Sequence, residues 1–477
     1  MAGSQTTNMT VGSPVKHILT FALPLLIGNL FQQLYNMVDS IVVGNFVGSD
    51  ALAAVGTCGS ANFLFFSLSS GLAIGIGVIV SQFYGANDIE NVRATIANAV
   101  YVLATVSIIV GVAGYSATPF ILGLLQVPEE IMPYSVLYMR TTCFGILGIA
   151  IYNGVASILR ALGDSRTPLY FLILSSLVNV VLDLTFVLSF DLGVFGVALA
   201  TILSQYVSAV ASMAYAYWKV PYFKLTMEEL RPHGRIIVRS FRLGVPIALQ
   251  SSMIAVSCMA LQGVVNGFGK TVMAAYTVTA RIEQLVQQPY SSLASAVTTY
   301  SGQNIGAGKV ERVKKGFRQS VVIVLVFSLV MLPVMYFCGE SFVRLFVKDD
   351  QETVRIAARA LRLTSLCYFG LGMIYVPRGL MNGCGDAAFA MINGLSEVVC
   401  RLSFARIFTK IPAIGYWGVW LTTGATWSVT GVVCLIRYFR GAWKQKAITR
   451  DRKDKSIYLQ NAQKPEGMFC AKSTKLL

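Results

Sequence analysis

Long apolar runs alternate with short polar turns along almost the whole chain. Twelve of these runs reach the roughly 20 residues that a helix needs to cross a bilayer. They cover residues 17–43, 51–83, 94–118, 131–158, 169–190, 194–218, 240–265, 273–300, 318–338, 355–381, 387–409 and 414–440. Turn-forming residues separate them, as at Gly163-Asp164-Ser165. The pattern predicts an all-α polytopic membrane protein with twelve transmembrane helices.

The second half of the chain repeats features of the first half at a nearly constant distance. Pro24 in the first run corresponds to Pro246, which lies 222 residues later. Matches at the same offset join Phe120 to Phe342, Arg140 to Arg362, Gly163-Asp164 to Gly385-Asp386 and Gly193-x-x-Gly196 to Gly415-x-x-Gly418. One further match, at an offset of 221, joins Gln82-x-x-Gly85-Ala86 to Gln303-x-x-Gly306-Ala307. So many matches at one offset indicate an internal duplication.

Each half holds six runs, and an even number of crossings returns the chain to its starting side. The two six-helix lobes are therefore expected to share one orientation and to be related by a pseudo-two-fold axis along the membrane normal, with a cleft between them. The predicted units are an N-terminal segment (1–16), an N-lobe (17–218), a linker (219–239), a C-lobe (240–440) and a basic, poorly ordered tail (441–477).

The short loops differ in positive charge between the two sides of the membrane. With these spans, one side carries twelve basic residues, among them Arg93, Arg160 and Arg166, and the other carries four, among them Lys270. Because positive loops stay inside the cell, the first side is predicted to be cytoplasmic. Both termini and the 219–239 linker lie on that side.

Composition supports a membrane protein and argues against other classes. Charged residues make up 13% of the chain and hydrophobic residues 55%, whereas soluble domains carry roughly 25% charged residues. The net charge of +16 raises the question of nucleic-acid binding, but the basic residues lie in loops and in the tail, as membrane topology explains. No nucleic-acid partner is therefore expected. Nine cysteines without a CxxC pair and two histidines argue against a zinc site.

Ionisable side chains inside the apolar runs are the strongest functional signal, because a charge in a bilayer is costly unless it is paired or hydrated. Asp39 lies late in the first run, and Asp183 lies in the fifth, one helical turn after Asn179. The basic residues of this half lie at or near run ends, so neither aspartate has an evident basic partner. A proton or a bound cation would then neutralise these aspartates.

Neighbouring residues complete a set of oxygen atoms of the kind that hard cations bind. Tyr35, one turn before Asp39, can hydrogen-bond it, and Thr201 in the sixth run can add a hydroxyl. The alternative is that Asp39 only caps a helix end and that Asp183 only approaches the outer interface. Pro24 removes a backbone hydrogen bond early in the first helix, so it predicts either a functional kink or static packing.

The second half carries charges that can neutralise one another, which favours a structural role. Glu397 and Arg401 are four residues apart in the favourable helical order, and Arg281 and Glu283 share a run. Gly269-Lys270-Thr271 resembles the end of a P-loop but lacks the preceding glycine, so an ATP-driven pump is not predicted. No reactive cluster suggests an enzyme, and no cofactor is expected apart from a coupling ion.

The sequence resembles the multidrug and toxic compound extrusion (MATE) family, and most closely its DinF-like bacterial branch, over roughly residues 14–440. The segments that carry the likeness are FALPLLIGNLFQQLYNMVDSIVVGNFVGSDALAAVG, SQFYGAND, RALGDSRTP, NVVLDL and SGQNIGAGK. The resemblance implies a two-lobed antiporter of the bacterial inner membrane that exports amphipathic or cationic organic compounds in exchange for inward Na⁺ or H⁺. It also implies an N-lobe ion site formed by Asp39, Asn179, Asp183 and Thr201, with Tyr35 and Pro24 beside it.

Two departures and one alternative accompany the resemblance. The other bacterial branch of the family places acids in its seventh and tenth helices, but 240–265 and 355–381 contain none here, so a C-lobe cation site of that kind is not expected. The alternative function is a lipid-linked precursor flippase of the same superfamily, which would line its cleft with several basic residues. Arg281, Arg378 and Arg401 are the candidates for that role. In either case the chain is expected to act as a monomer.

Overall fold

The computed structural model describes residues 6–125, 127–347 and 350–448. The N-lobe begins with α1, whose last turn widens into the π-helical segment η1 (Val43–Val47), and its sixth helix continues into a second such segment, η2 (Thr185–Ser189). The bounds of its helices are α1 Pro14–Val42, α2 Ser49–Gly85, α3 Ile89–Leu124, α4 Met132–Cys143, α5 Ile146–Ala161, α6 Arg166–Leu184 and α7 Gly193–Lys219.

The C-lobe follows a short linker that contains the 3₁₀ turn η3 (Pro221–Phe223). Two further 3₁₀ turns, η4 (Gly415–Trp417) and η5 (Ala442–Gln445), flank its last helix. The bounds of its helices are α8 Gly234–Asn266, α9 Lys270–Gly306, α10 Val310–Arg344, α11 Gln351–Ser365, α12 Tyr368–Gly383, α13 Ala387–Lys410 and α14 Gly418–Arg440.

These helices account for the twelve predicted spans. In the described part of the chain, nine helices are individually long and apolar enough to cross a membrane. Two more spans are bent pairs, α4 with α5 (45°) and α11 with α12 (53°), and the bends lie at equivalent places in the two lobes. The twelfth span is α9, which has 37 residues and is more polar than the nine single helices.

The outer faces of the helices are apolar, as a lipid-facing surface requires. α10 is the most apolar span, and little of it is buried against the rest of the protein. Large apolar side chains are exposed along it and along α3, including Val322, Val326, Leu329, Val330, Ile108, Ile109 and Val112. In water such a surface would drive aggregation, whereas hydrocarbon solvates it.

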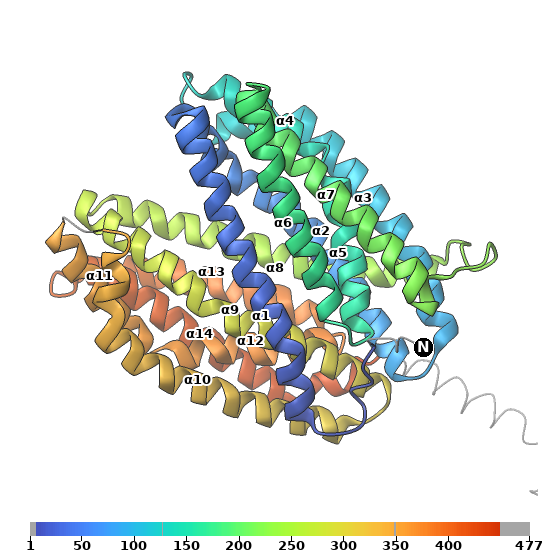
Figure 1. The fold of residues 1–477 in the computed structure, drawn as a ribbon. Helices are drawn as coiled ribbons and strands as arrows, with labels where there is room; N and C mark the ends of the chain where they lie inside the picture. Colours follow the sequence, from blue (N-terminus) through green and yellow to red (C-terminus); the bar gives the residue numbers. More distant parts are fainter. Residues whose placement is uncertain (1–5, 126, 348–349, 449–477) are drawn as a thin grey trace, which may run out of the picture.

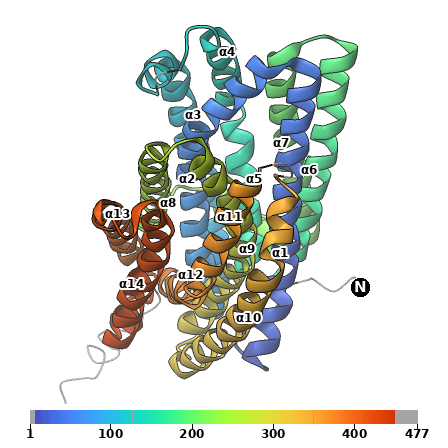
Figure 2. The same cartoon turned by 90° about the vertical axis from the view of Figure 1, so that its left-hand side faces the viewer.

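The two lobes meet at one end of the molecule and diverge towards the other (Figures 1 and 2). Small residues allow the close approach of α2 and α8: a Cβ built on Gly71 would lie 2.6 Å from Ala248, and one on Gly75 would lie 2.6 Å from Gly244. Such contacts replace hydrophobic association, which lipid tails do not drive. The glycines of α2 therefore serve close helix packing.

At the joined end, the closing turns of α2 and α9 pack against each other symmetrically. A Cβ on Gly85 would lie 1.9 Å from the Gln303 carbonyl oxygen, and one on Gly306 would lie 2.0 Å from the Gln82 carbonyl oxygen. Gly85 is the repeat equivalent of Gly306, and Gln82 is the repeat equivalent of Gln303. The same patch on both lobes therefore forms this interface, as a two-fold relation between the lobes requires.

Four hydrogen bonds made by Gln82 and Gln303 close this interface, and we call them the interlobe lock. Both glutamines are fully buried. The Gln82 side chain donates to the Gly383 carbonyl (2.8 Å), and the Gln303 side chain donates to the equivalent Ala161 carbonyl (2.9 Å). Each glutamine links its own lobe to the other lobe.

The two remaining bonds of the lock attach the terminal segments. The Met9 amide donates to Gln303 Oε1 (2.9 Å), and the Ile448 amide donates to Gln82 Oε1 (2.7 Å). Trp443 and Ile448 are both buried. The prediction of poor order is therefore wrong for residues 441–448, and 449–477 lie outside the described residues.

The linker between the lobes is also attached to the N-lobe. Arg93 donates from Nε and Nη2 to the two carboxylate oxygens of Glu229 and also contacts the Lys224 carbonyl. The hydrogen bonds from Arg93 lower the pKa of Glu229 to about 2. Because this pKa lies below its ordinary value, the contact is complete at neutral pH and weakens only as the pH falls from about 4.5 towards 2.

Candidate functional site

Helices α1 and α6 bring the predicted N-lobe residues together. Tyr35 and Asp39 lie one turn apart on α1, and Asn179 and Asp183 lie one turn apart on α6, so each pair shares a helix face. Both α6 residues are 1% exposed. α7 adds Thr201 beside them. The set expected from sequence therefore converges in one place, which we call the N-lobe site.

Asn179 connects the members of the N-lobe site. Its amide meets complementary partners when its nitrogen donates to Tyr35 Oη (3.2 Å) and to Asp183 Oδ2 (2.9 Å). The amide oxygen then accepts from the Thr201 backbone N–H (3.2 Å). The Thr201 hydroxyl donates to the Val197 carbonyl in its own helix (3.1 Å), so its oxygen can still act as an acceptor.

Both carboxyl groups of the N-lobe site lack a full set of partners. Asp39 Oδ1 and Asp183 Oδ1 are buried and accept no hydrogen bond from the described residues. The two carboxyls lie close enough for one to hydrogen-bond the other, which requires a proton on one of them. Within the described part of the chain, no ion pair joins either aspartate to a base.

This geometry suits a proton or a hard cation. Two carboxylates in contact in a low-dielectric site cannot both stay ionised without a counter-charge. No group of three His, Cys, Asp or Glu side chains is present in the described residues, so a site for a transition metal is not formed there. The oxygens that would hold Na⁺ are those of Asp39, Asp183, Asn179 and Thr201.

The N-lobe site opens into a cavity of about 550 Å³, which we call the N-lobe cavity. Asp39, Tyr35 and Thr201 line it, and so does Pro24, beside which α1 continues without a break in its helix. Tyr138, which is buried next to Asp39, was not singled out from the sequence, because nothing in its local pattern marks it.

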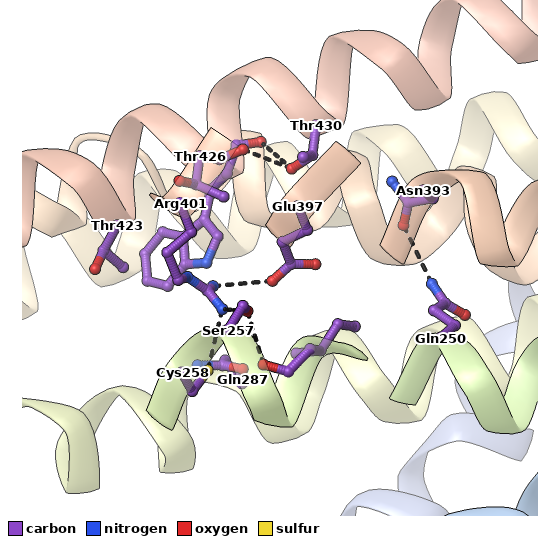
Figure 3. Close-up of polar contacts among 12 residues, drawn as sticks. Gln250, Ser257, Cys258, Gln287, Asn393, Glu397, Arg401, Thr423, Thr426 and Thr430 are labelled. Atoms are coloured by element: carbon purple, nitrogen blue, oxygen red, sulfur yellow. Dashed lines mark hydrogen bonds and ion pairs between the residues drawn. The ribbon is translucent and has the colours of Figure 1, made fainter. Parts of the chain in front are cut away.

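The corresponding place in the C-lobe holds an ion pair (Figure 3). Arg401 Nη2 donates to Glu397 Oε1 (2.9 Å) and Arg401 Nη1 donates to Ser257 Oγ (2.5 Å), with all three residues buried. At the repeat offset of 222, Arg401 is the equivalent of Asn179, and Ser257 is the equivalent of Tyr35. A built-in cation thus occupies the C-lobe position that corresponds to the centre of the N-lobe site.

The second predicted pair of the C-lobe does not form. Glu283 is buried, and its Oε1 has no partner among the described residues, whereas Arg281 is exposed. Residues two apart on a helix point to different faces, so these two side chains cannot meet. Mutual neutralisation is therefore confirmed for Glu397 with Arg401 and is wrong for Glu283 with Arg281.

Breaking the buried pair is expected to destabilise the C-lobe. In Glu397→Gln, Arg401 keeps its charge but loses its counter-charge, and stranding a buried charge costs roughly 3–5 kcal/mol. The purified variant should unfold at a lower temperature than wild type. Arg401→Met with Glu397→Leu, which removes both charges, should recover most of the loss. A Glu397→Gln protein as stable as wild type would show that the pair has no such role.

A second cavity, of about 380 Å³, lies between the lobes, and we call it the interlobe cleft. It borders the interlobe lock at Ser81 and Ala161. Arg160 of α5 and Arg378 of α12 both line it. Arg160 was assigned to a cytoplasmic loop from the sequence, but it lies within α5, and its direction depends on how the lobes pack.

Comparison with known proteins places this architecture in a family. The model of the MatE family matches residues 24–185 and again residues 246–407. This chain belongs to the MatE family. The two MatE matches begin at Pro24 and Pro246 and confirm the duplication with its offset of 222.

Relatives of this MatE chain match over nearly its whole length. The probable multidrug resistance protein YpnP of Bacillus subtilis is 29% identical over 440 residues, which cover 92% of this chain and 97% of YpnP. The probable multidrug resistance protein NorM of Thermotoga maritima is 25% identical, with 92% and 95% covered. A MATE multidrug resistance transporter solved in an outward-facing conformation is 25% identical, with a TM-score of 0.83 and 93% and 99% covered. The twelve-helix, two-lobed fold is the fold of this family.

Proposed function

We propose that this chain is a multidrug efflux antiporter that exports small amphipathic or cationic organic compounds in exchange for inward Na⁺ or H⁺. The names of its relatives YpnP and NorM and the fold of a multidrug resistance transporter support efflux. In this proposal the interlobe cleft and the N-lobe cavity accommodate the substrate. The lobes alternate between the arrangement seen here, which is joined at the interlobe lock, and one joined at the other end.

The observation that carries the coupling proposal is the pair of buried, unpartnered carboxyl oxygens on Asp39 and Asp183. A bound proton or Na⁺ would satisfy both oxygens and add positive charge to the N-lobe. Export is driven only when ion and substrate favour opposite states of the transporter. The C-lobe is not expected to bind a second coupling ion, because the fixed positive charge of Arg401 lies at the position equivalent to Asn179. The N-lobe site would then be the single coupling site.

Orientation follows from positive charge in the loops. The joined end carries the N-terminal segment, the linker and the basic loop before α10, so we propose that it faces the cytoplasm. The lobes would then open away from the cytoplasm in this structure. The localisation that follows is the bacterial inner membrane, with both termini inside.

Labelling of single cysteines tests this orientation. Two single cysteines are introduced into a cysteine-free protein. Met227→Cys lies in the linker, where the native Met227 is 86% exposed. Lys270→Cys lies at the start of α9, on the other side of the membrane. A membrane-impermeant maleimide added to intact cells should label position 270 but not position 227. Labelling at 227 alone would reverse the topology.

The alternative of a lipid-linked precursor flippase gains little support from the arginines predicted for it. Arg281 is exposed, and Arg401 is engaged with Glu397. Of those three candidates, Arg378 alone lines the interlobe cleft. With Arg160, two guanidinium groups line the cleft, which is fewer than the several basic residues expected for a lipid-linked pyrophosphate, so the drug antiporter is the function that we favour.

Transport by purified protein in liposomes tests the proposed function. A pH gradient and a Na⁺ gradient are imposed separately, and uptake of a fluorescent organic substrate is followed with each. Uphill movement with one gradient identifies the coupling ion. Failure of both gradients to drive any amphipathic substrate would refute the antiporter.

A further inference from the structure

The interlobe cleft carries positive charge and no carboxylate. Its lining comes from both lobes and includes many serine and threonine residues, Gln250 and Asn382, but the charged side chains are Arg160 and Arg378. The N-lobe cavity differs, because Asp39 lines it. The two cavities share Leu25, Asn29 and Arg160 along their common wall, so Arg160 stands between a cavity that also contains a carboxyl group and a cleft that contains none.

The two arginines come from equivalent helices of the two lobes. α5 and α12 are each the second half of a bent span. At the repeat offset of 222, Arg160 corresponds to Asn382, and Arg378 corresponds to Ala156. If one lobe is superposed on the other, the two arginines therefore lie one helical turn apart on the same helix. Each lobe therefore presents one guanidinium to the same cleft. A ligand bound to both would bridge the lobes.

Neither guanidinium is neutralised within the described part of the chain. No ion pair or side-chain hydrogen bond is found for Arg160 there. Arg378 lies over the Tyr375 ring at 4.8 Å, and the nearby acid, Glu397, is already paired with Arg401. Each arginine has five N–H donors. Most of them remain available to a ligand in the cleft.

We propose that the interlobe cleft binds the anionic group, a carboxylate or a phosphate, of an amphipathic substrate through Arg160 and Arg378. This inference rests on the proposed function, and it narrows the substrate class from organic cations to compounds that carry an acidic group, zwitterions included. Guanidinium groups bind carboxylates and phosphates through paired hydrogen bonds, which are stronger when water is excluded. An organic cation without an acidic group would meet two like charges in the cleft.

A pair of dyes that differ in one carboxylate tests this specificity. Rhodamine B carries a free carboxylate, and its ethyl ester carries none, while the cationic ring system is the same. Binding of each dye to the purified protein in detergent is measured by fluorescence anisotropy. The acid should bind about tenfold more tightly than the ester, because one charge-assisted pair supplies roughly a factor of ten or more.

Variants of the two arginines assign the preference to the cleft. Arg378→Gln and Arg160→Gln should each remove most of the acid's advantage and leave the ester's affinity unchanged or higher. Arg378→Lys, which keeps the positive charge, should retain part of the preference for the acid. Arg355→Gln, in the other half of the same bent span and exposed, should behave as wild type. Because ester binding is recorded for every variant, a misfolded protein is recognised by loss of both dyes.

Equal affinity of the wild-type protein for the two dyes would overturn the proposal. A preference for the acid that survives in both glutamine variants would overturn the assignment to these arginines. Since the assay uses no membrane and no ion gradient, neither result depends on antiport. Failure of the proposed function would appear separately, as the absence of uphill transport in liposomes.

Discussion

Replacing Asp39 with asparagine is expected to abolish export against a gradient while leaving a folded, membrane-inserted protein. Asparagine keeps the size and hydrogen-bonding capacity of the side chain but cannot take up a proton or supply charge to a cation. The buried oxygen of Asp39 already lacks a partner, so little stabilising contact is lost. Asp183→Asn should have the same effect, because the two carboxyls act as one site.

The size of the loss follows from the driving force. One inward positive charge gains about 2.3 kcal/mol per 100 mV of membrane potential, enough for a substrate gradient on the order of 40-fold. Without the coupling ion, the transporter can only equilibrate its substrate. Cells that produce Asp39→Asn protein and are incubated with dye should therefore reach the same steady-state dye content as cells without the transporter, whereas wild-type protein should hold that content lower.

Two controls accompany this measurement. Asp50→Asn changes an exposed aspartate at the start of α2 and should export as wild type does. The abundance of each variant in the membrane is compared by immunoblot. Normal efflux by Asp39→Asn at normal abundance would place the coupling site elsewhere.

Replacing Gly85 with alanine is expected to open the joined end of the molecule. The new methyl group would lie 1.9 Å from the Gln303 carbonyl oxygen, which is backbone and cannot rotate away. Overpacking of this kind typically costs 1–3 kcal/mol. The equilibrium should shift by roughly ten- to a hundredfold away from the arrangement closed by the interlobe lock.

Distances between spin labels report this shift. Glu90→Cys and Glu311→Cys place labels on exposed, equivalent positions of α3 and α10, just after the joined turns. Gly85→Ala should increase the population with a long distance between the labels. Gly263→Ala is the matched control, because no atom lies within 4 Å of a Cβ built there. An unchanged distance distribution in Gly85→Ala would show that this contact does not hold the lobes together.

The helices and the residues of the N-lobe site could be predicted because a bilayer restricts both the backbone conformation and the side chains of the segments that cross it. Backbone in lipid must be helical, so the apolar runs fix the spans, and the duplication adds the relation between the lobes. Aspartates inside a span are costly, so Asp39 and Asp183 stand out in the sequence alone. The structure then supplied their mutual contact and the bridging role of Asn179.

Features that depend on how the lobes pack could not be predicted. Arg160 stands near a helix end, and its position in the sequence does not tell whether it faces the cytoplasm or the interlobe cleft. Gln82 and Gln303 appeared as a repeated pair, but their partners lie in the opposite lobe and in the terminal segments. The separation of Arg281 from Glu283 was different, since helix geometry alone excludes their contact.

The central claim is that the N-lobe site couples ion entry to substrate export. The most direct test is to measure ion entry that depends on substrate. Purified protein is reconstituted in liposomes, substrate is added on the side opposite to the ion, and entry of H⁺ or Na⁺ is recorded. Wild-type protein should show ion entry that begins on substrate addition, and Asp39→Asn and Asp183→Asn should show none at equal reconstitution. Ion entry stimulated by substrate in both variants, at the wild-type rate, would contradict the account.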